Sequence, residues 1–289
     1  QARLWEDRNI LMNKSGLSVK AIQDDQGNVH THPQDISDAL MGTRQFVLDH
    51  PGPIQSEHDQ LLPADGQHCY FEPPTVDFAQ QVTLRSGDSQ PGTDGLPYGT
   101  WRLIPAATAQ LLIWIIEYVT ASVFDSLNNA PLPTVEQLLV WIPKAKQGPN
   151  PDNWRPLAIP PTIIRLLGAV TFGTAAAHAH RFMHPAQALL ADFKEAQGNF
   201  VLSQQTLIEA YRNKDTRLHQ VLLTDISKAF ERIHPHWIVK VLFSKGLPLW
   251  FIAISVLFLQ ARTSSPKIKG RKCSSLHISI GVDTGNALS

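Results

Sequence analysis

Apolar positions recur along this chain with two different periods, one typical of helices and one typical of strands. Apolar stretches with helical spacing predict helices at about 104–127, 161–183, 185–193, 203–213, 235–245 and 248–260. Short β-leaning runs predict strands at about 137–142, 154–159, 220–223 and 275–280. Long helices and short strands are therefore both expected in this chain.

The first ninety residues are less regular. Residues 1–50 start with an amphipathic helical pattern, and Val19–Asn28 reads as strand, tight turn and strand. Thr31 or Asp35 would cap the helix that follows. Residues 51–90 are rich in Pro, Gly, Asp and Gln and have little periodicity, which indicates a linker or an insertion on the surface.

Two of the predicted strands form a plausible β-hairpin. The first, Gln137–Ile142, ends in Pro143-Lys144, and the second begins at Trp154. The polar loop between them carries Lys144 and Lys146, and Arg155 follows it. These cations either bind an anion or are simply solvated charges, and Lys146 is the weaker candidate.

The composition, 43% hydrophobic and 17% charged, is that of an ordinary globular protein. Cys69 and Cys273 are far apart, which argues against a disulfide framework or a zinc ribbon and favours a reducing, intracellular setting in nucleus or cytoplasm. The apolar segments 103–119 and 247–259 are too polar or too short for a membrane span of roughly twenty apolar residues. We therefore expect two buried helices and no membrane partner.

The net charge of zero conceals an asymmetry between two parts of the chain. Residues 1–100 carry 14 acidic and 6 basic side chains, whereas residues 101–289 carry 11 acidic and 19 basic ones. Five of the basic residues lie within Arg262–Lys272. The second part is therefore suited to a polyanion, and the run at 262–272 is either a contact to nucleic-acid phosphates or a solvated hairpin.

The functional interpretation of the chain depends most on the stretch Leu222–Ile233. An apolar strand ends at Asp225, and Phe230 follows five residues later. A sheet that holds a carboxylate still at the end of a strand suits metal chemistry. The alternatives are an aspartate that caps the next turn and a phenylalanine that is part of the core.

Six short motifs follow one another in a fixed order along the chain. They are Gly27 with Thr31–Leu40, Pro91-Gly-Thr-Asp-Gly-Leu-Pro-Tyr98, Trp141-Ile-Pro-Lys144 with Asn153–Pro160, Gln197-Gly-Asn-Phe200, Asp225-Ile-Ser-Lys-Ala-Phe230 and Gly281–Ser289. In this order the chain resembles the reverse transcriptases of non-LTR (LINE-type) retrotransposons. The resemblance implies an α+β fold that is incomplete at the C-terminus. It would have an N-terminal extension at 1–50 that links to an upstream region, and the fingers and partial palm of a right-hand polymerase at 91–289. Since the first residue is not Met and both ends look cut, we expect an excerpt of a longer polypeptide.

The resemblance also implies a chemistry, in which two Mg²⁺ ions assist transfer of a deoxynucleotide to a primer. Asp225 would be a metal ligand, the backbone of Ile226, Ser227, Lys228 and Ala229 would lie under the triphosphate, and Phe230 would exclude the ribose 2′-hydroxyl. The residues that would bind the nucleotide from elsewhere are Lys144, Arg155 and Gly285. The residues that would contact the RNA template or DNA primer are Lys267, Lys269, Arg271 and Lys272.

The sequence departs from the family's pattern at its C-terminal end. The aromatic-x-Asp-Asp turn that completes the metal site is absent, and Asp283 and Thr284 stand where the family has a polar residue and glutamine. We therefore expect this excerpt to be inactive in polymerisation. Two alternatives are a degenerate or domesticated non-catalytic nucleic-acid-binding remnant and a group II intron maturase-like reverse transcriptase. The oligomeric state is open.

Overall fold

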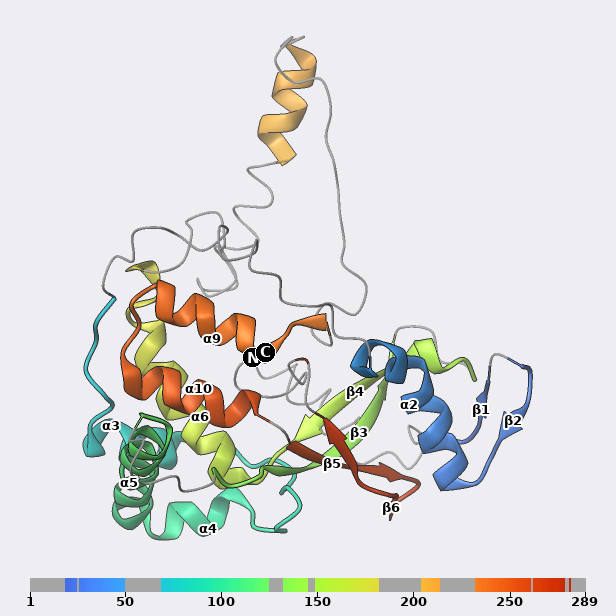
Figure 1. The fold of residues 1–289 in the computed structure, drawn as a ribbon, viewed down its shortest axis with the longest axis horizontal. Coiled ribbons are helices and arrows are strands. Elements are labelled where there is room, and N and C mark those ends of the chain that lie inside the picture. The colour runs from blue at the N-terminus through green and yellow to red at the C-terminus, as the bar shows by residue number, and fades with distance from the viewer. Residues whose placement is uncertain are drawn as a thin grey trace.

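A computed structural model gives the structure of the chain in nine stretches. They are residues 19–24, 26–49, 69–124, 132–144, 149–181, 204–213, 232–260, 262–278 and 281. Helices gather on one side of the molecule, and a sheet with one covering helix occupies the other (Figure 1). The sheet contains both parallel and antiparallel pairs, so the predicted α+β class is confirmed.

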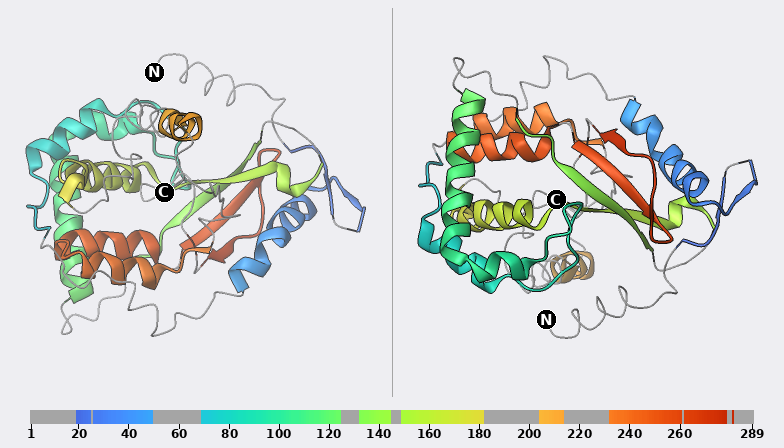
Figure 2. Two further views of the ribbon diagram at one scale, coloured as in Figure 1. Left: turned by 90° about the horizontal axis from the view of Figure 1, so that it is seen from above. Right: turned by 90° about the horizontal axis from the view of Figure 1, so that it is seen from below.

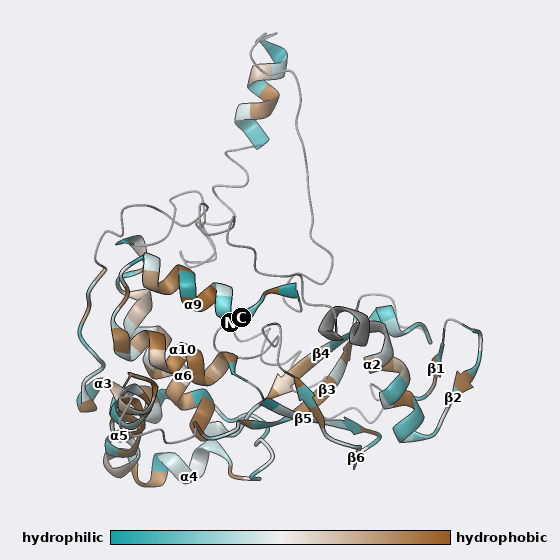
Figure 3. Cartoon of the chain, viewed as in Figure 1, coloured by the Kyte–Doolittle hydropathy of each residue, from teal (hydrophilic) through white to brown (hydrophobic). Residues whose placement is uncertain are grey.

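On the helical side, six helices of the described ranges share one apolar core. They are α3 (Val76–Arg85), α4 (Tyr98–Leu103), α5 (Pro105–Phe124), α6 (Thr162–Ala176), α9 (Pro235–Ser244) and α10 (Leu249–Leu259). A 3-10 turn, η3 (Ala179–Arg181), follows α6. Helix α10 has no charged residue and is enclosed by its neighbours, since a helix that is apolar all round must be buried. Its prediction as a buried helix is confirmed, and the apolar colouring of this layer is visible in Figure 3.

The prediction of a buried helix for the apolar segment 103–119 is confirmed on only one face of α5. Its inner face, which includes Leu112 and Ile116, is buried in the helical core. Within the described ranges it is the one helix whose length and composition would allow it to cross a membrane, although only 28% of its most apolar window is buried. Its outer face, which includes Trp114, is exposed. The expectation of a fully buried helix is therefore wrong for that outer face.

Residues 76–85, within the stretch predicted to be a linker or an insertion on the surface, form the helix α3. Thr75 caps this helix, because its hydroxyl oxygen accepts a hydrogen bond from the backbone N–H of Phe78 at 3.2 Å. Ala79 is buried in the helical core, and Phe78 packs against that core. The second half of the stretch therefore contributes to packing rather than connecting two parts over the surface.

The main sheet has the strand order β4-β3-β5-β6, and β7 pairs with β5. The strands are β3 (Glu136–Pro143), β4 (Trp154–Ile159), β5 (Arg262–Ile268), β6 (Arg271–Lys272) and β7 (Leu276–Ile278). β3 and β4 are antiparallel and form the predicted hairpin, whereas β3 and β5 are parallel. The basic run at 262–272 also folds as a hairpin, with Lys269 and Gly270 at its turn. Both have positive φ angles of 50° and 79°, as a two-residue type I′ turn requires.

One face of the sheet is covered by the N-terminal part of the chain, which comprises β1 (Ile22–Gln23), β2 (Val29–His30) and α2 (Pro33–Asp49). Leu139, Trp141 and Trp154 project toward this side and join its second, smaller apolar core. The strand–turn–strand prediction at residues 19–28 is confirmed by the antiparallel pair β1–β2. Neither predicted cap, Thr31 nor Asp35, holds that position, because α2 starts at Pro33, directly after His32, and Asp35 already lies in its first turn.

The turn Pro91–Tyr98 joins the sheet to the helical layer. A Cβ atom added at Gly92 would lie 2.5 Å from the backbone nitrogen of Pro161, where β4 leads into α6, so only glycine fits here. The hydroxyl of Thr162 donates to the carbonyl oxygen of Leu96 at 2.8 Å and accepts from the indole N–H of Trp101 at 2.7 Å. This turn therefore fixes the end of β4 relative to the helices.

Several predicted features lie outside the described residues. They are the strand at 220–223, the motif Asp225–Phe230, the motif Gln197–Phe200, Lys146, the helix at 185–193, and the last motif except Gly281. The helix predicted at 203–213 is present at 204–212.

Candidate phosphate-binding face of the sheet

Lys144 and Arg155 lie next to each other at the open end of the β3–β4 hairpin. Ile142 pairs directly with Arg155, and the backbone N–H of Lys144 donates to the carbonyl oxygen of Asn153 at 2.7 Å. Since side chains two residues apart on a strand share a face, Lys144 is the diagonal neighbour of Arg155 on one face of the sheet. Both residues are exposed. The hairpin therefore presents two cations side by side.

The local sequence explains why these two side chains face outward. The side chain of Asn150 accepts a hydrogen bond from the backbone N–H of Asp152 at 2.8 Å and starts a short 3-10 turn, η2 (Pro151–Asn153). Trp154, the first residue of β4, is buried against the α2 side. Because successive strand residues point to opposite faces, Arg155 must project away from α2.

Two cations of the β5–β6 hairpin share this face. Ser265 pairs with Leu138, which lies on the same face as Ile142 and Arg155, and Lys267 follows Ser265 by two residues. Lys272 pairs directly with Lys267 and therefore projects from the same side. The face that faces away from α2 therefore carries four cations near the ends of its strands, which we call the basic row, with Ile142 and Val140 on the same face between Arg155 and Lys267. Its members are Lys144, Arg155, Lys267 and Lys272.

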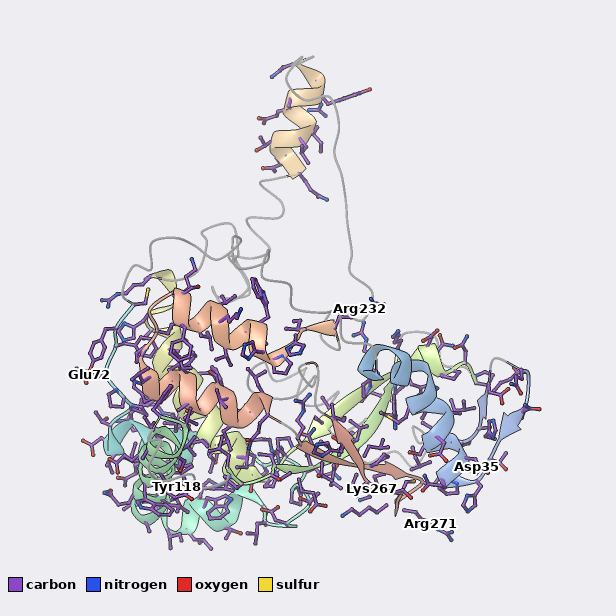
Figure 4. The ribbon with its side chains drawn as sticks, viewed as in Figure 1. Asp35, Glu72, Tyr118, Arg232, Lys267 and Arg271 are labelled. Carbon is purple, nitrogen blue, oxygen red and sulfur yellow. The ribbon has the colours of Figure 1, made fainter. Side chains whose placement is uncertain are left out.

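The other two cations of this hairpin do not join the basic row. Arg271 pairs with Ile268, whose side chain is buried on the α2 side, so Arg271 projects from that opposite face. Lys269 lies at the turn, and its ammonium group donates to the carbonyl oxygen of Thr31 at 2.8 Å. Figure 4 shows Lys267 and Arg271 at this end of the sheet. The predicted nucleic-acid contacts are therefore divided between two faces.

One acidic residue, Glu136, borders the basic row and was not singled out by the sequence analysis. Its carboxylate accepts a hydrogen bond from the ammonium of Lys272 at 2.8 Å and a longer one from the hydroxyl of Ser265 at 3.4 Å. The hydrogen bond from Lys272 is the largest cause that lowers the pKa of the Glu136 carboxyl below its usual value. The only sequence signal for Glu136 is a charged residue at the start of an apolar strand.

The remaining cations of the row are not neutralised in the same way. Among the described residues, the side chains of Lys144, Arg155 and Lys267 make no ion pair. A neighbouring pair of unneutralised cations on a rigid hairpin attracts a polyvalent anion, and the planar guanidinium of Arg155 can donate two parallel hydrogen bonds to a phosphate.

The described residues fit phosphate better than metal ions. Within the described ranges, no group of three or more His, Cys, Asp or Glu side chains is arranged to hold a metal ion. The expected Mg²⁺ ligand, Asp225, and its neighbours Ile226 to Phe230 lie outside those ranges, as does Gly285. Of the residues predicted to bind the nucleotide, the structure therefore describes Lys144 and Arg155.

A comparison with models of the known protein families finds no match to this chain.

Proposed function

We propose that this chain is the fingers and partial palm of an RNA-directed DNA polymerase of the non-LTR retrotransposon type. The observation that carries the proposal is the position of Lys144 and Arg155 on one exposed face of the β3–β4 hairpin. These two residues come from the motifs that the family uses to bind the incoming triphosphate. The same face of the sheet also carries Lys267 and Lys272, which would contact the phosphates of template or primer.

In the proposed function each site residue has one role. Arg155 would donate two hydrogen bonds to the triphosphate, and the ammonium group of Lys144 would add a positive charge beside the guanidinium. Two Mg²⁺ ions, for which Asp225 would be one ligand, would activate the primer hydroxyl and neutralise the leaving group. Phe230 would exclude nucleotides that carry a 2′-hydroxyl.

The direct test is binding of a deoxynucleoside triphosphate to the purified chain, measured by titration calorimetry with and without Mg²⁺. We expect Arg155→Ala and Lys144→Ala each to weaken binding about tenfold, because each removes a charge-assisted contact to phosphate. Arg271→Ala is the matched control, since it removes an equal charge from the opposite face and should leave the affinity unchanged. An equal loss in all three variants would indicate attraction by net charge alone and would contradict the proposed site.

Two further variants address the residues near Asp225. Asp225→Asn should remove the Mg²⁺-dependent part of the binding while leaving the Mg²⁺-independent part. Phe230→Ala should allow the ribonucleotide to bind about as well as the deoxynucleotide. If sugar discrimination is unchanged in Phe230→Ala, the role assigned to Phe230 is wrong.

A second candidate is a nucleic-acid-binding module without catalysis, and the spread of the four cations over one face of the sheet favours it. Such a module would bind single-stranded RNA with an affinity that falls steeply with salt concentration, and it would bind free nucleotides weakly. Strong RNA binding that is unaffected by Asp225→Asn, together with no measurable nucleotide binding, would favour this candidate over the polymerase. A group II intron maturase-like protein would share the site, so it is distinguished only by its RNA substrate.

A further inference from the structure

Helix α5 has two apolar faces, and only one of them is covered. The inner face is buried in the helical core through Thr108, Ala109, Leu112, Ile116 and Val119. A surface helix normally presents charged and polar residues outward. On α5 the exposed residues are apolar except for Gln110 and Glu117.

The exposed apolar residues form a stripe along the helix, which we call the outer stripe. Its members are Ile104, at the N-terminal boundary of α5, and Ala107, Leu111, Trp114, Tyr118 and Ala121. The rings of Trp114 and Tyr118 stack with their centroids 5.6 Å apart. Figure 2 shows α5 along the side of the helical layer that is farthest from the sheet, so the outer stripe is remote from the basic row.

The spacing of the outer stripe fits a second helix. Its positions are separated alternately by three and four residues, as are the a and d positions of a coiled coil. A shallow hollow of about 370 Å³ lies on this face and is lined by Gln110, Leu111, Ile113, Trp114 and Glu117. Four of these residues stand at i, i+3, i+4 and i+7, the arrangement that receives one side chain from a facing helix.

We propose that a second copy of this chain occupies the outer stripe, with the two α5 helices antiparallel about a twofold axis. In that arrangement a positions face d positions, so Leu111 meets Trp114 of the other copy and Ala107 meets Tyr118. Ile104 likewise meets Ala121. Each small side chain is therefore opposite a large one, whereas a parallel pair would stack Trp114 on itself and leave a gap between the two Ala107 residues.

The polar residues of this face are also complementary in the antiparallel arrangement. Gln110 lies beside Glu117 of the other copy, where its amide group can donate a hydrogen bond to the carboxylate. The two Glu117 carboxylates are kept apart on opposite sides of the axis. Pairing therefore leaves no like charges in contact, which an interface between identical surfaces requires.

The exposed area is sufficient for a reversible dimer. The exposed fractions are 57% for Trp114, 54% for Ile104, 40% for Tyr118 and 38% for Leu111. Together these side chains offer roughly 400 Å², about half of the 800 Å² per partner in a standard interface, which is typical of a weak association. We therefore expect a dimer that dissociates in the micromolar range.

A lipid surface fits the outer stripe less well. Helices that lie on membranes carry Lys or Arg on their polar face, which attracts anionic lipid headgroups. Helix α5 has no basic residue, and the charged side chain on its exposed face is Glu117, an acid. The buried inner face also prevents α5 from entering a bilayer without unfolding the helical core.

The first test measures the oligomeric state of the full chain by sedimentation equilibrium over a range of concentrations. Leu111→Glu should weaken self-association at least a hundredfold, because it places a charge at the centre of the interface. Leu249→Glu is the matched control, since Leu249 is 52% exposed on α10 and lies outside the outer stripe. A wild-type chain that stays monomeric up to ~100 µM, or equal effects of the two substitutions, would overturn the proposal.

The second test establishes the orientation of the helices by disulfide cross-linking in a Cys273→Ser background. The double variant Ala107→Cys with Tyr118→Cys should give covalent dimers on oxidation, whereas Ala107→Cys alone should not. Efficient cross-linking of the single variant would indicate a parallel pair and overturn the antiparallel arrangement. Sedimentation of the chain with phosphatidylcholine and phosphatidylserine vesicles, abolished by Leu111→Glu, would overturn it in favour of a lipid partner.

Discussion

The helical layer and the sheet differ in how their residues are used. The helical layer is held by apolar packing, with α10 enclosed and aromatic rings such as Phe172 and Phe251 in edge contact 5.5 Å apart. The sheet has an apolar face against α2 and an opposite face whose ends carry charged and hydroxyl side chains. Stability and candidate chemistry are therefore separated in this molecule. Substitutions in the helical layer should change folding, and substitutions on the basic row should change binding.

The largest expected effect is in the helical core. Ile252 is fully buried on α10, so Ile252→Ala should lower the free energy of unfolding by about 2–5 kcal/mol, measured by urea denaturation. Leu249→Ala, at an exposed position of the same helix, should change it by about 0.5 kcal/mol or less. Similar losses in both variants would mean that α10 is not the centre of the core.

The next largest effect is at the junction of the two regions. Gly92→Ala should cost about 1–3 kcal/mol, because the added Cβ atom meets the backbone of Pro161 and neither group can move freely. Gly42→Ala in α2 is the control, since nothing lies within 4 Å of its added Cβ and alanine favours a helix. We expect Gly42→Ala to be neutral or slightly stabilising in the same denaturation experiment.

A smaller, pH-dependent effect is expected in the β1–β2 turn. The pKa of Asp24 is lowered from 3.8 to about 2, first by a hydrogen bond with His30 and then by hydrogen bonds from Asn28. A carboxyl whose pKa is lower in the folded state stabilises the fold above its unfolded pKa, and this contribution is lost as the pH falls toward 2. The stability difference between the wild type and Asp24→Asn should therefore be present at pH 5 and shrink between pH 4 and pH 2. A difference that does not change with pH would contradict this origin.

The smallest effect on stability is expected at Glu136, which borders the basic row. Glu136 and Lys272 are both about half exposed, so Glu136→Gln should change the free energy of unfolding by about 0.5 kcal/mol or less. It should nevertheless raise the affinity for a triphosphate or single-stranded RNA about twofold to fivefold, since Lys272 is released and a negative charge is removed. Lower affinity in Glu136→Gln would show that the Glu136–Lys272 pair positions the row rather than competing with the ligand.

The sequence predicted the elements that have a strong period or a local partner. Helix α10 is apolar throughout, and the β3–β4 hairpin pairs two strands that follow each other in the sequence. Helix α3 was missed because Pro73 and Pro74 precede it and its apolar positions are few. Its signal was the capping residue Thr75 followed by Asp77 in the first turn.

The arrangement of the candidate site could be predicted only in part. The residue types Lys144 and Arg155 were identifiable from the motifs, and strand alternation places them on one face once the register is known. That Lys267 belongs to the same face, whereas Arg271 does not, depends on the parallel pairing of β5 with β3. No local pattern specifies a pairing between strands that are more than a hundred residues apart.

The same parallel pairing has a consequence for the order in which the protein folds during synthesis. β3 can pair with β4 as soon as both strands have been synthesised, but its other edge stays unpaired until β5 follows. The side-chain amide of Gln137 on β3 then donates a hydrogen bond to the hydroxyl of Ser264 on β5, across a sequence separation of 127 residues. Contacts of such long range form slowly, and an unpaired strand edge is a template for pairing with another chain. Nascent chains that stop between Ile159 and Arg262 should therefore need chaperone protection, and the last part of the sheet should be the rate-limiting step of folding.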